Sequence, residues 1–136
     1  MSVTKVIDLM QKDVKTVRPH AVIGDVVVSL ADAHISAMPV VDGSGRMLGV
    51  VSATDVIAAE AETADGPAYA ELIQNTMVQD LMTPHALTVG PEADVREAAR
   101  RMLYAEVHRL FVVENDQLVG VISTLDIVRA VATGKI

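Results

Sequence analysis

The chain has 136 residues and a 51% hydrophobic composition, which provides apolar material for one core or for two small halves that pack together. Eleven Lys and Arg residues stand against eighteen Asp and Glu residues, and the net charge of -7 disfavours nucleic acid as a partner. The absence of Cys excludes disulfides and thiolate metal sites, and no apolar run approaches the roughly 20 residues of a membrane span. We therefore expect a cytoplasmic protein without membrane insertion.

The chain contains a long internal repeat. The sequence VIDLM at residues 6–10 returns as VQDLM at residues 78–82, and TVRP at residues 16–19 returns as TVGP at residues 88–91. Both pairs are offset by 72 residues. Self-similarity at a fixed offset indicates two structural units built on one plan.

Each copy predicts the same order of elements: a short helical turn, a strand, a helix, a β-hairpin and a second helix. The helices are indicated by apolar residues at i, i+3, i+4 and i+7, the spacing of one buried face. These residues are Ile23, Val26, Val27 and Leu30 in the first copy, and Val95, Ala98, Ala99 and Met102 in the second.

Two hairpins follow these helices. In the first copy, apolar strands at residues 38–41 and 47–51 flank a glycine-containing turn at residues 42–46. In the second copy, strands at residues 110–113 and 118–122 flank a turn that is one residue shorter. The length difference therefore falls in a loop, where it costs little stability.

A strand-to-helix corner closes each copy, at residues 49–55 (GVVSATD) and 120–126 (GVISTLD). The Ser can accept a hydrogen bond from a free helical N–H, and the Asp three residues later can reach back to the Ser backbone. This capping box predicts helix starts at Ser52 and Ser123. The last helix then carries apolar residues at Leu125, Val128 and Val131.

These patterns predict an α/β fold of two repeated β-α-β-β-α motifs packed about a pseudo-twofold axis, because neither half can bury its apolar surface alone. We place repeat one at residues 1–64, a linker at residues 65–76 and repeat two at residues 77–136. Asp65-Gly66-Pro67 breaks the preceding helix, and residues 68–73 form an additional helical turn without a counterpart in repeat two.

The two tandem copies of V-x-D-L-M, a Thr-Val strand, a helix, a hairpin and G-h-[VI]-S-x-x-D (h apolar) closely resemble a pair of cystathionine-β-synthase (CBS) domains. Such a pair is called a Bateman module, and here it resembles a stand-alone CBS protein. In ligand-binding members of that family, adenosine nucleotides or S-adenosylmethionine lie in the cleft between the halves. The resemblance implies that Asp55 and Asp126 accept hydrogen bonds from the ribose, and that Ser52 and Ser123 touch ribose or phosphate. The competing interpretation is that these four residues are only helix caps.

The same resemblance implies a surface for the base and one for the phosphate. His108-Arg109 matches the family's H-R-x-P-V segment, whose basic residues reach a phosphate, although Phe111 departs from the usual Pro. The equivalent pair in repeat one is Ser36-Ala37, so the basic contact exists once. The positions that match base contacts are Thr16, Met38, Pro39, Thr88, Leu110 and Phe111.

A single basic pair suits a monophosphate, so we favour an AMP-like ligand over ADP, ATP, NAD(H) or S-adenosylmethionine. We expect a regulatory module, as in energy sensing, that needs no cofactor, forms a homodimer and acts on another protein in trans. The alternative is an interaction scaffold without a small-molecule ligand. Catalysis and a metal site are not expected, because the sequence lacks nucleophile and P-loop motifs and its four His residues share no ligand spacing.

Overall fold

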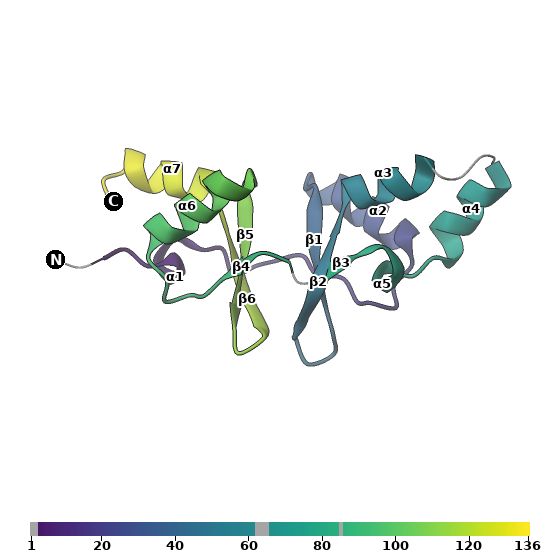
Figure 1. Cartoon of the computed structure of the whole chain (residues 1–136), viewed down its shortest axis with the longest axis horizontal. Coiled ribbons are helices and arrows are strands. Elements are labelled where there is room, and N and C mark those ends of the chain that lie inside the picture. The colour runs from purple at the N-terminus through teal and green to yellow at the C-terminus, as the bar shows by residue number, and fades with distance from the viewer. Residues whose placement is uncertain (1–2, 62–65, 85) are drawn as a thin grey trace. The chain divides into compact units, whose positions relative to one another are not determined.

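The structure is a computed structural model that describes residues 3–61, 66–84 and 86–136. It divides into two compact units, unit 1 (Met1–Val14 with Leu87–Ile136) and unit 2 (Lys15–Ala86). The division into repeat one (residues 1–64), a linker (65–76) and repeat two (77–136) stays a prediction. The compact units do not coincide with these repeats, because unit 1 combines residues from both ends of the chain. Asp65 and His85 lie outside the described residues. Figure 1 labels the helices and strands of both units.

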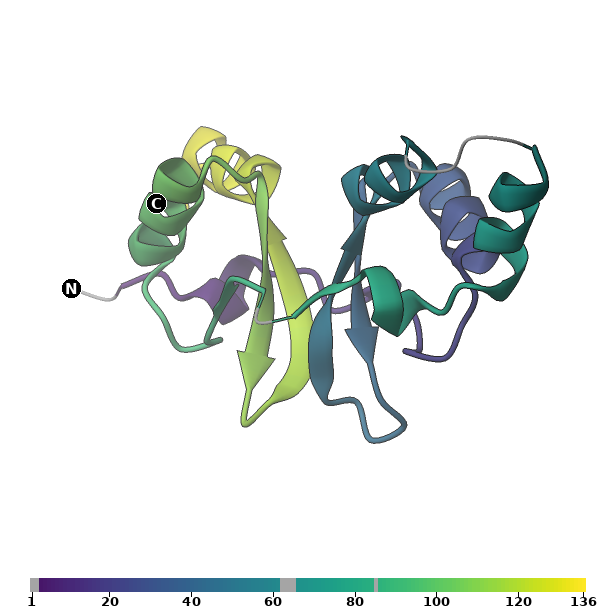
Figure 2. The same ribbon diagram turned by 45° about the vertical axis from the view of Figure 1, so that its right-hand side comes forward.

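Unit 2 is built on a three-stranded antiparallel sheet in the order β1-β2-β3. Val17 adds a parallel bridge to Val40 at the edge of β1. Figure 2 shows α4 beside α2, where this additional helix buries Leu72. The elements are α2 (Ile23–Ala33), β1 (Ala37–Val41), β2 (Met47–Ser52), α3 (Ala53–Ala61), α4 (Gly66–Asn75), α5 (Val78–Leu81) and β3 (Thr83–Pro84).

Unit 1 repeats this plan with a sheet in the order β4-β5-β6, in which β4 is parallel to β5 and β5 is antiparallel to β6. Helices α6 and α7 lie side by side against β5 and β6 (Figure 1). The predicted α/β fold with two repeated motifs is confirmed. The elements are α1 (Val6–Leu9), β4 (Thr88–Val89), α6 (Val95–Ala105), β5 (Arg109–Glu114), β6 (Gln117–Ser123) and α7 (Thr124–Ala132).

Each unit takes its short first helix from the other sequence repeat. In unit 1 the Val6 N–H donates to the Ala93 carbonyl at 2.9 Å, and in unit 2 the Val78 N–H donates to the Ala21 carbonyl at 2.8 Å. These bonds satisfy backbone donors that a helix start leaves free. Val6 and Val78 are also fully buried, so each helix is part of the core of its unit.

Both predicted hairpins are present, and their turns differ in chemistry as well as in length. In the first, the Asp42 carboxylate accepts hydrogen bonds from the Ser44 hydroxyl at 2.7 Å and the Ser44 N–H at 2.9 Å, which lower the pKa of Asp42. In the second, Asn115 and Asp116 adopt positive φ angles of 52° and 67°, as a two-residue hairpin turn requires. The shorter loop is therefore a tighter turn.

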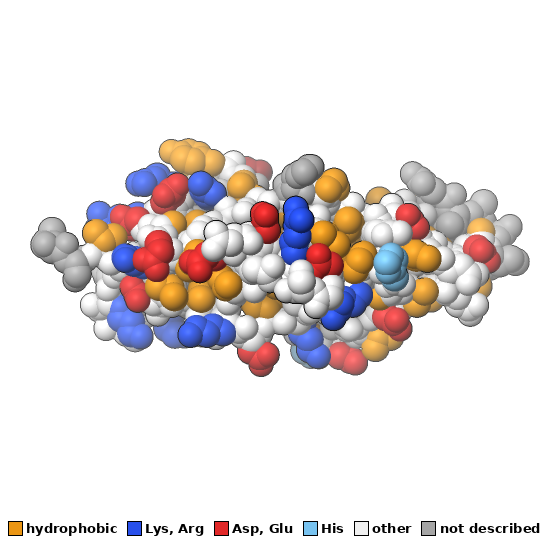
Figure 3. All heavy atoms as spheres, turned by 90° about the horizontal axis from the view of Figure 1, so that it is seen from below, with side chains coloured by type: hydrophobic (Ala, Val, Ile, Leu, Met, Phe, Trp, Pro, Cys, Tyr) orange, Lys and Arg blue, Asp and Glu red, His pale blue; other side chains and the backbone are white. Residues whose placement is uncertain are grey.

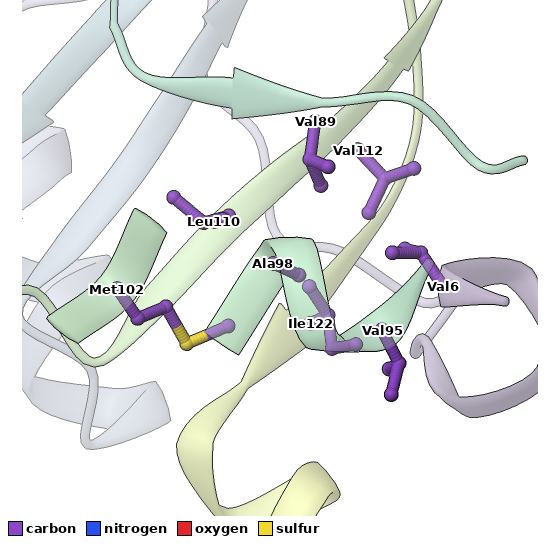
Figure 4. Close-up of a cluster of buried hydrophobic side chains, with 8 residues drawn as sticks. All are labelled: Val6, Val89, Val95, Ala98, Met102, Leu110, Val112 and Ile122. Atoms are coloured by element: carbon purple, nitrogen blue, oxygen red, sulfur yellow. The ribbon is translucent and has the colours of Figure 1, made fainter. Parts of the chain in front are cut away.

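The core of unit 1 gathers side chains from both helix and strand elements. Figure 4 shows them pointing toward one another between α6 and the sheet, with α1 at one end. They are Val6, Val89, Val95, Ala98, Met102, Leu110, Val112 and Ile122. The equivalent core of unit 2 contains Ile23, Val26, Leu30, Met38, Val40, Val51, Val56 and Val78.

One detail of the predicted helix faces is wrong. Val27 is 38% exposed, whereas Ile23, Val26 and Leu30 of the same helix are buried in the core of unit 2. On α7 the apolar positions Leu125, Val128 and Val131 are about 60% exposed, while Asp126 and Ala130 are buried. Helical spacing identifies a shared face but does not say whether that face meets the core.

Candidate functional site

The strand-to-helix corners have the predicted capping geometry in both units. At the Asp55 corner (Ser52–Asp55), the Ser52 N–H donates to Asp55 Oδ2 at 2.8 Å and the Asp55 N–H donates to Ser52 Oγ at 3.1 Å. At the Asp126 corner (Ser123–Asp126), the two equivalent distances are also 2.8 and 3.1 Å. The capping prediction is confirmed. Each corner places a Ser hydroxyl and a carboxylate at a helix N-terminus, where the dipole favours an anion.

The Asp126 carboxylate is only 7% exposed and is surrounded by donors. Its Oδ2 accepts from the Ser123 N–H at 2.8 Å and from the Ser123 hydroxyl at 3.0 Å. Its Oδ1 accepts from Gln11 Nε2 at 3.1 Å and lies 3.5 Å from Arg129 Nη1. A carboxylate offers about four lone-pair directions. Three hydrogen bonds and one ion pair use most of this capacity here.

The Asp55 carboxylate has a different environment. It is half-buried, and Oδ2 accepts the Ser52 N–H at 2.8 Å. Oδ1 has no hydrogen-bond or ion-pair partner among residues 3–61, 66–84 and 86–136. Most of the accepting capacity of this carboxylate therefore remains available to a bound molecule.

A polar cavity of about 250 Å³ lies next to the Asp126 corner in unit 1. Its lining includes acidic Asp8 and Asp126 and basic Arg129 and Lys135. Charges of both signs also lie interspersed over the face drawn in Figure 3. In the described part of the chain, no three His, Asp or Glu side chains form a group suited to a metal ion, and no helix is long and apolar enough to cross a membrane.

The residues predicted to approach a base lie on the strands that lead to these corners. Met38 and Leu110 are buried in the cores of their units, so a ligand would meet mainly their backbone. Pro39 and Phe111 are also buried but are not members of these two cores, because successive side chains of a strand point to opposite faces of the sheet. Thr16 precedes the bridge that Val17 makes, and Thr88 pairs with Phe111. Their roles in binding stay predictions.

The predicted basic pair is divided between two places. Arg109 lies opposite Ser123 across the β5–β6 ladder, and its guanidinium has no hydrogen-bond or ion-pair partner among the described residues. His108 instead lines a second cavity of about 700 Å³ between α6 and α7, which does not include Asp126. Arg109 is therefore the better placed of the two to meet an anion at the Asp126 corner.

The cavity between α6 and α7 is a groove with a largely apolar rim. Its lining includes Met102, Val107 and Ile127. Five large apolar side chains on α6 and α7, two of which (Leu103 and Val128) line this cavity, are between 59% and 81% exposed. These side chains are Leu103, Tyr104, Leu125, Val128 and Val131. We call this set the α6–α7 face.

Gln11 and Arg129 also belong to the candidate site, and neither was predicted from the sequence. Gln11 is 115 residues from Asp126 in the chain, so no local pattern connects them. One signal was present: the equivalent positions in the other repeat are Thr83 and Ala58, so the repeat is broken at both positions that contact Asp126. Departures from an internal repeat therefore indicated where the two units differ.

Comparison with known proteins places these features in context. The family model described as "CBS domain" matches residues 6–62 and 78–133. The chloroplastic CBS domain-containing protein CBSX1 of Arabidopsis thaliana is 28% identical over 141 residues, covering 88% of this chain and 60% of that protein. An inosine-5'-monophosphate dehydrogenase of Methanocaldococcus jannaschii is 29% identical over 129 residues, covering 94% of this chain and 24% of the enzyme. The chain thus spans 60% or less of these curated relatives.

Among solved structures, CBSX2 of Arabidopsis thaliana in complex with AMP has the same fold. It aligns with a TM-score of 0.81 and 30% sequence identity, covering 97% of this chain and 98% of the CBSX2 chain. The matched region includes both units.

Proposed function

Because this chain belongs to the CBS domain family, with one match in each repeat, we propose that it is a regulatory module that binds an adenosine-containing ligand. The observation that carries this proposal is the carboxylate of Asp55, which stands at a helix N-terminus and whose Oδ1 has no partner among the described residues. Support comes from CBSX2, which is 30% identical and was crystallised with AMP.

The chemistry of the Asp55 corner fits a ribose. An ionised carboxylate only accepts hydrogen bonds, and the two hydroxyls of a cis-diol are both donors. Ser52 Oγ adds a further polar atom at the same helix start. A bound ribose and the helix cap can coexist, because the cap uses only Oδ2 of Asp55.

We propose AMP as the preferred ligand of the Asp126 corner, the corner that Arg109 serves. Its guanidinium is unpaired among the described residues and lies on the strand position opposite Ser123. One guanidinium can bind a monophosphate in a bidentate manner, whereas longer phosphate chains require more positive charge or a metal ion. A protein that senses AMP in this way would report on the energy state of the cell.

Arg109→Ala should remove most of the advantage of AMP over adenosine. A charge-assisted hydrogen bond contributes about 1.5–3 kcal/mol, so AMP binding should weaken about tenfold or more while adenosine binding changes little. Thermal shift and calorimetric titration with adenosine, AMP, ATP and GMP measure this. Arg100→Ala is the matched control, because it removes the same charge from the exposed surface of α6.

Three outcomes of this titration separate the alternatives. If no adenosine compound stabilises the parent protein, the ligand-binding proposal fails and the interaction scaffold without a ligand replaces it. If Arg109→Ala binds AMP as tightly as the parent, the AMP preference is wrong. Release of a product from AMP or ATP would contradict the proposal that the module is not an enzyme.

We also propose that the protein is a homodimer that uses the α6–α7 face. Contiguous exposed apolar side chains beside a groove are typical of a protein interface, and a second copy supplies the same apolar side chains to cover them. Ligand binding could then act on a partner in trans by changing the shape of the module or its dimer contacts. The effect is limited by the difference in ligand affinity between the two states. Cytoplasmic location stays a prediction.

Leu103→Glu should convert the dimer to a monomer, because it places a carboxylate in the apolar face where Leu103 is 72% exposed. Light scattering after size exclusion should give twice 14.4 kDa for the parent and 14.4 kDa for the variant. Ile136→Glu is the control, since Ile136 is exposed but lies outside α6 and α7. A parent that is monomeric, or a Leu103→Glu protein that remains dimeric, contradicts this interface.

A further inference from the structure

The two corners share one design but differ in what surrounds the carboxylate. Gln11 pairs with Val121 of β6, and Thr83 pairs with Val50, the equivalent residue of β2. Gln11 and Thr83 are therefore structural equivalents. Arg129 and Ala58 occupy equivalent positions on α7 and α3. Unit 1 therefore holds an amide and a guanidinium against its corner carboxylate, and no side chain at the equivalent positions contacts Asp55 in the described part of unit 2.

These two donors change how much of the carboxylate is available. Asp126 receives hydrogen bonds from the Ser123 N–H, the Ser123 hydroxyl and Gln11 Nε2, and it forms an ion pair with Arg129. Asp55 receives one hydrogen bond, from the Ser52 N–H, among the described residues. A ribose can thus bind Asp55 directly, but at Asp126 it must first displace a protein donor.

Resting on the function proposed above, we infer that Gln11 is an internal competitor that closes the Asp126 corner, so that an adenosine ligand occupies the Asp55 corner first. Gln11 mimics the ligand chemically, because its amide N–H donates to the same carboxylate oxygen that a ribose hydroxyl would use. Arg129 adds to the effect through its positive charge. The module therefore has two unequal sites that fill in order as the ligand concentration rises.

The backbone around Gln11 allows this competition to be reversible. The Gln11 N–H donates to the Val121 carbonyl at 2.8 Å, and its own carbonyl accepts the Val121 N–H at 2.9 Å. The backbone is therefore fixed, while the side chain is exposed and held to Asp126 by one hydrogen bond of 3.1 Å. Rotation of the Gln11 side chain is enough to open the corner.

Calorimetric titration of the full chain with adenosine tests this inference, because adenosine has no phosphate and its binding therefore does not include the contribution of Arg109 at the Asp126 corner. The parent should show one tighter binding event and a second that is weaker by about tenfold or more. The second ligand must break a hydrogen bond to a charged group, and losing such a bond lowers affinity by about this factor. Asp55→Ala should remove the tighter event and leave the weaker one. In that Asp55→Ala background, Gln11→Thr should strengthen the remaining event about tenfold, because Thr is the residue that unit 2 has at this position.

Two further variants sharpen the test. The double variant Gln11→Thr/Arg129→Ala gives unit 1 the residue types that unit 2 has at Thr83 and Ala58. In this variant, the affinities of the Asp55 and Asp126 corners should be close to each other. Gln117→Thr is the matched control, because it makes the same change at an exposed position of β6 outside the cavity that Asp126 lines. It should leave both binding events as they are in the parent.

The outcomes distinguish this inference from the function on which it rests. Two equal adenosine sites in the parent, or a Gln11→Thr protein that behaves like Gln117→Thr, would overturn the role of Gln11 and leave the proposed adenosine binding intact. Absence of AMP, ADP, ATP and adenosine binding in every variant would overturn the proposed function and this inference together.

Discussion

Gly49→Ala should lower the free energy of unfolding by about 1–3 kcal/mol, the cost of forcing an extra methyl group into a packed site. A Cβ at Gly49 would lie 2.6 Å from the Thr83 carbonyl oxygen and 3.1 Å from Met82 Sδ. Thr83 belongs to β3, which pairs with β2 at this point, so a backbone segment would have to move. Urea unfolding followed by circular dichroism measures the change.

The same close approach recurs in unit 1 and gives a second test of this reasoning. A Cβ at Gly120 would lie 2.8 Å from the Gln11 carbonyl oxygen and 2.9 Å from Met10 Sδ. Gly120→Ala should therefore destabilise the protein by a similar amount and also displace Gln11 from Asp126. Gly90→Ala is the control, because its Cβ would meet no atom within 4 Å. Equal stability of the Gly49, Gly120 and Gly90 variants would contradict the packing argument.

Asp126→Ala should destabilise the protein more than Asp55→Ala does, by about 1–2 kcal/mol. Both substitutions remove a helix cap, which contributes about 1 kcal/mol. Only Asp126→Ala also removes the hydrogen bonds that a nearly buried carboxylate accepts from Gln11 Nε2 and from the Ser123 hydroxyl. The Arg129 ion pair adds little to the difference, because Arg129 is 58% exposed.

Parallel urea titrations of the two alanine variants measure this difference, and the similar capping geometry at the two corners makes Asp55→Ala an internal control. Gln11→Thr separates the contributions, since it removes the side-chain contact while keeping the Asp126 cap. It should cause a smaller loss of stability than Asp126→Ala. If Asp55→Ala and Asp126→Ala unfold at the same urea concentration, the additional contacts of Asp126 do not stabilise the fold.

Much of the local structure could be predicted from the sequence, because it depends on neighbouring residues. The hairpin at residues 37–52 follows from two apolar strands around a turn that contains glycine. The capping boxes follow from a Ser and an Asp three residues apart, since that spacing alone brings the side chains to the helix start. The internal repeat extended each of these predictions to the second half of the chain.

The sequence pattern could not determine which faces meet the core. Leu125, Val128 and Val131 have the spacing of a buried stripe, yet they are exposed and Asp126 is buried. Asp126 tolerates burial because Ser123, Gln11 and Arg129 satisfy its charge and its lone pairs. Burial depends on the direction in which a neighbouring element approaches, and helical periodicity does not contain that direction.

By itself, then, the sequence determined the repeated α/β plan, the family and the two Ser-x-x-Asp corners, all of which rest on short-range spacing. The tertiary structure alone decided that the two corners are chemically different. That difference arises because Gln11, which is 115 residues from Asp126, is brought to β6 by a pair of backbone hydrogen bonds with Val121. Contacts over such separations form only when the chain folds, since they depend on which segments the core brings together.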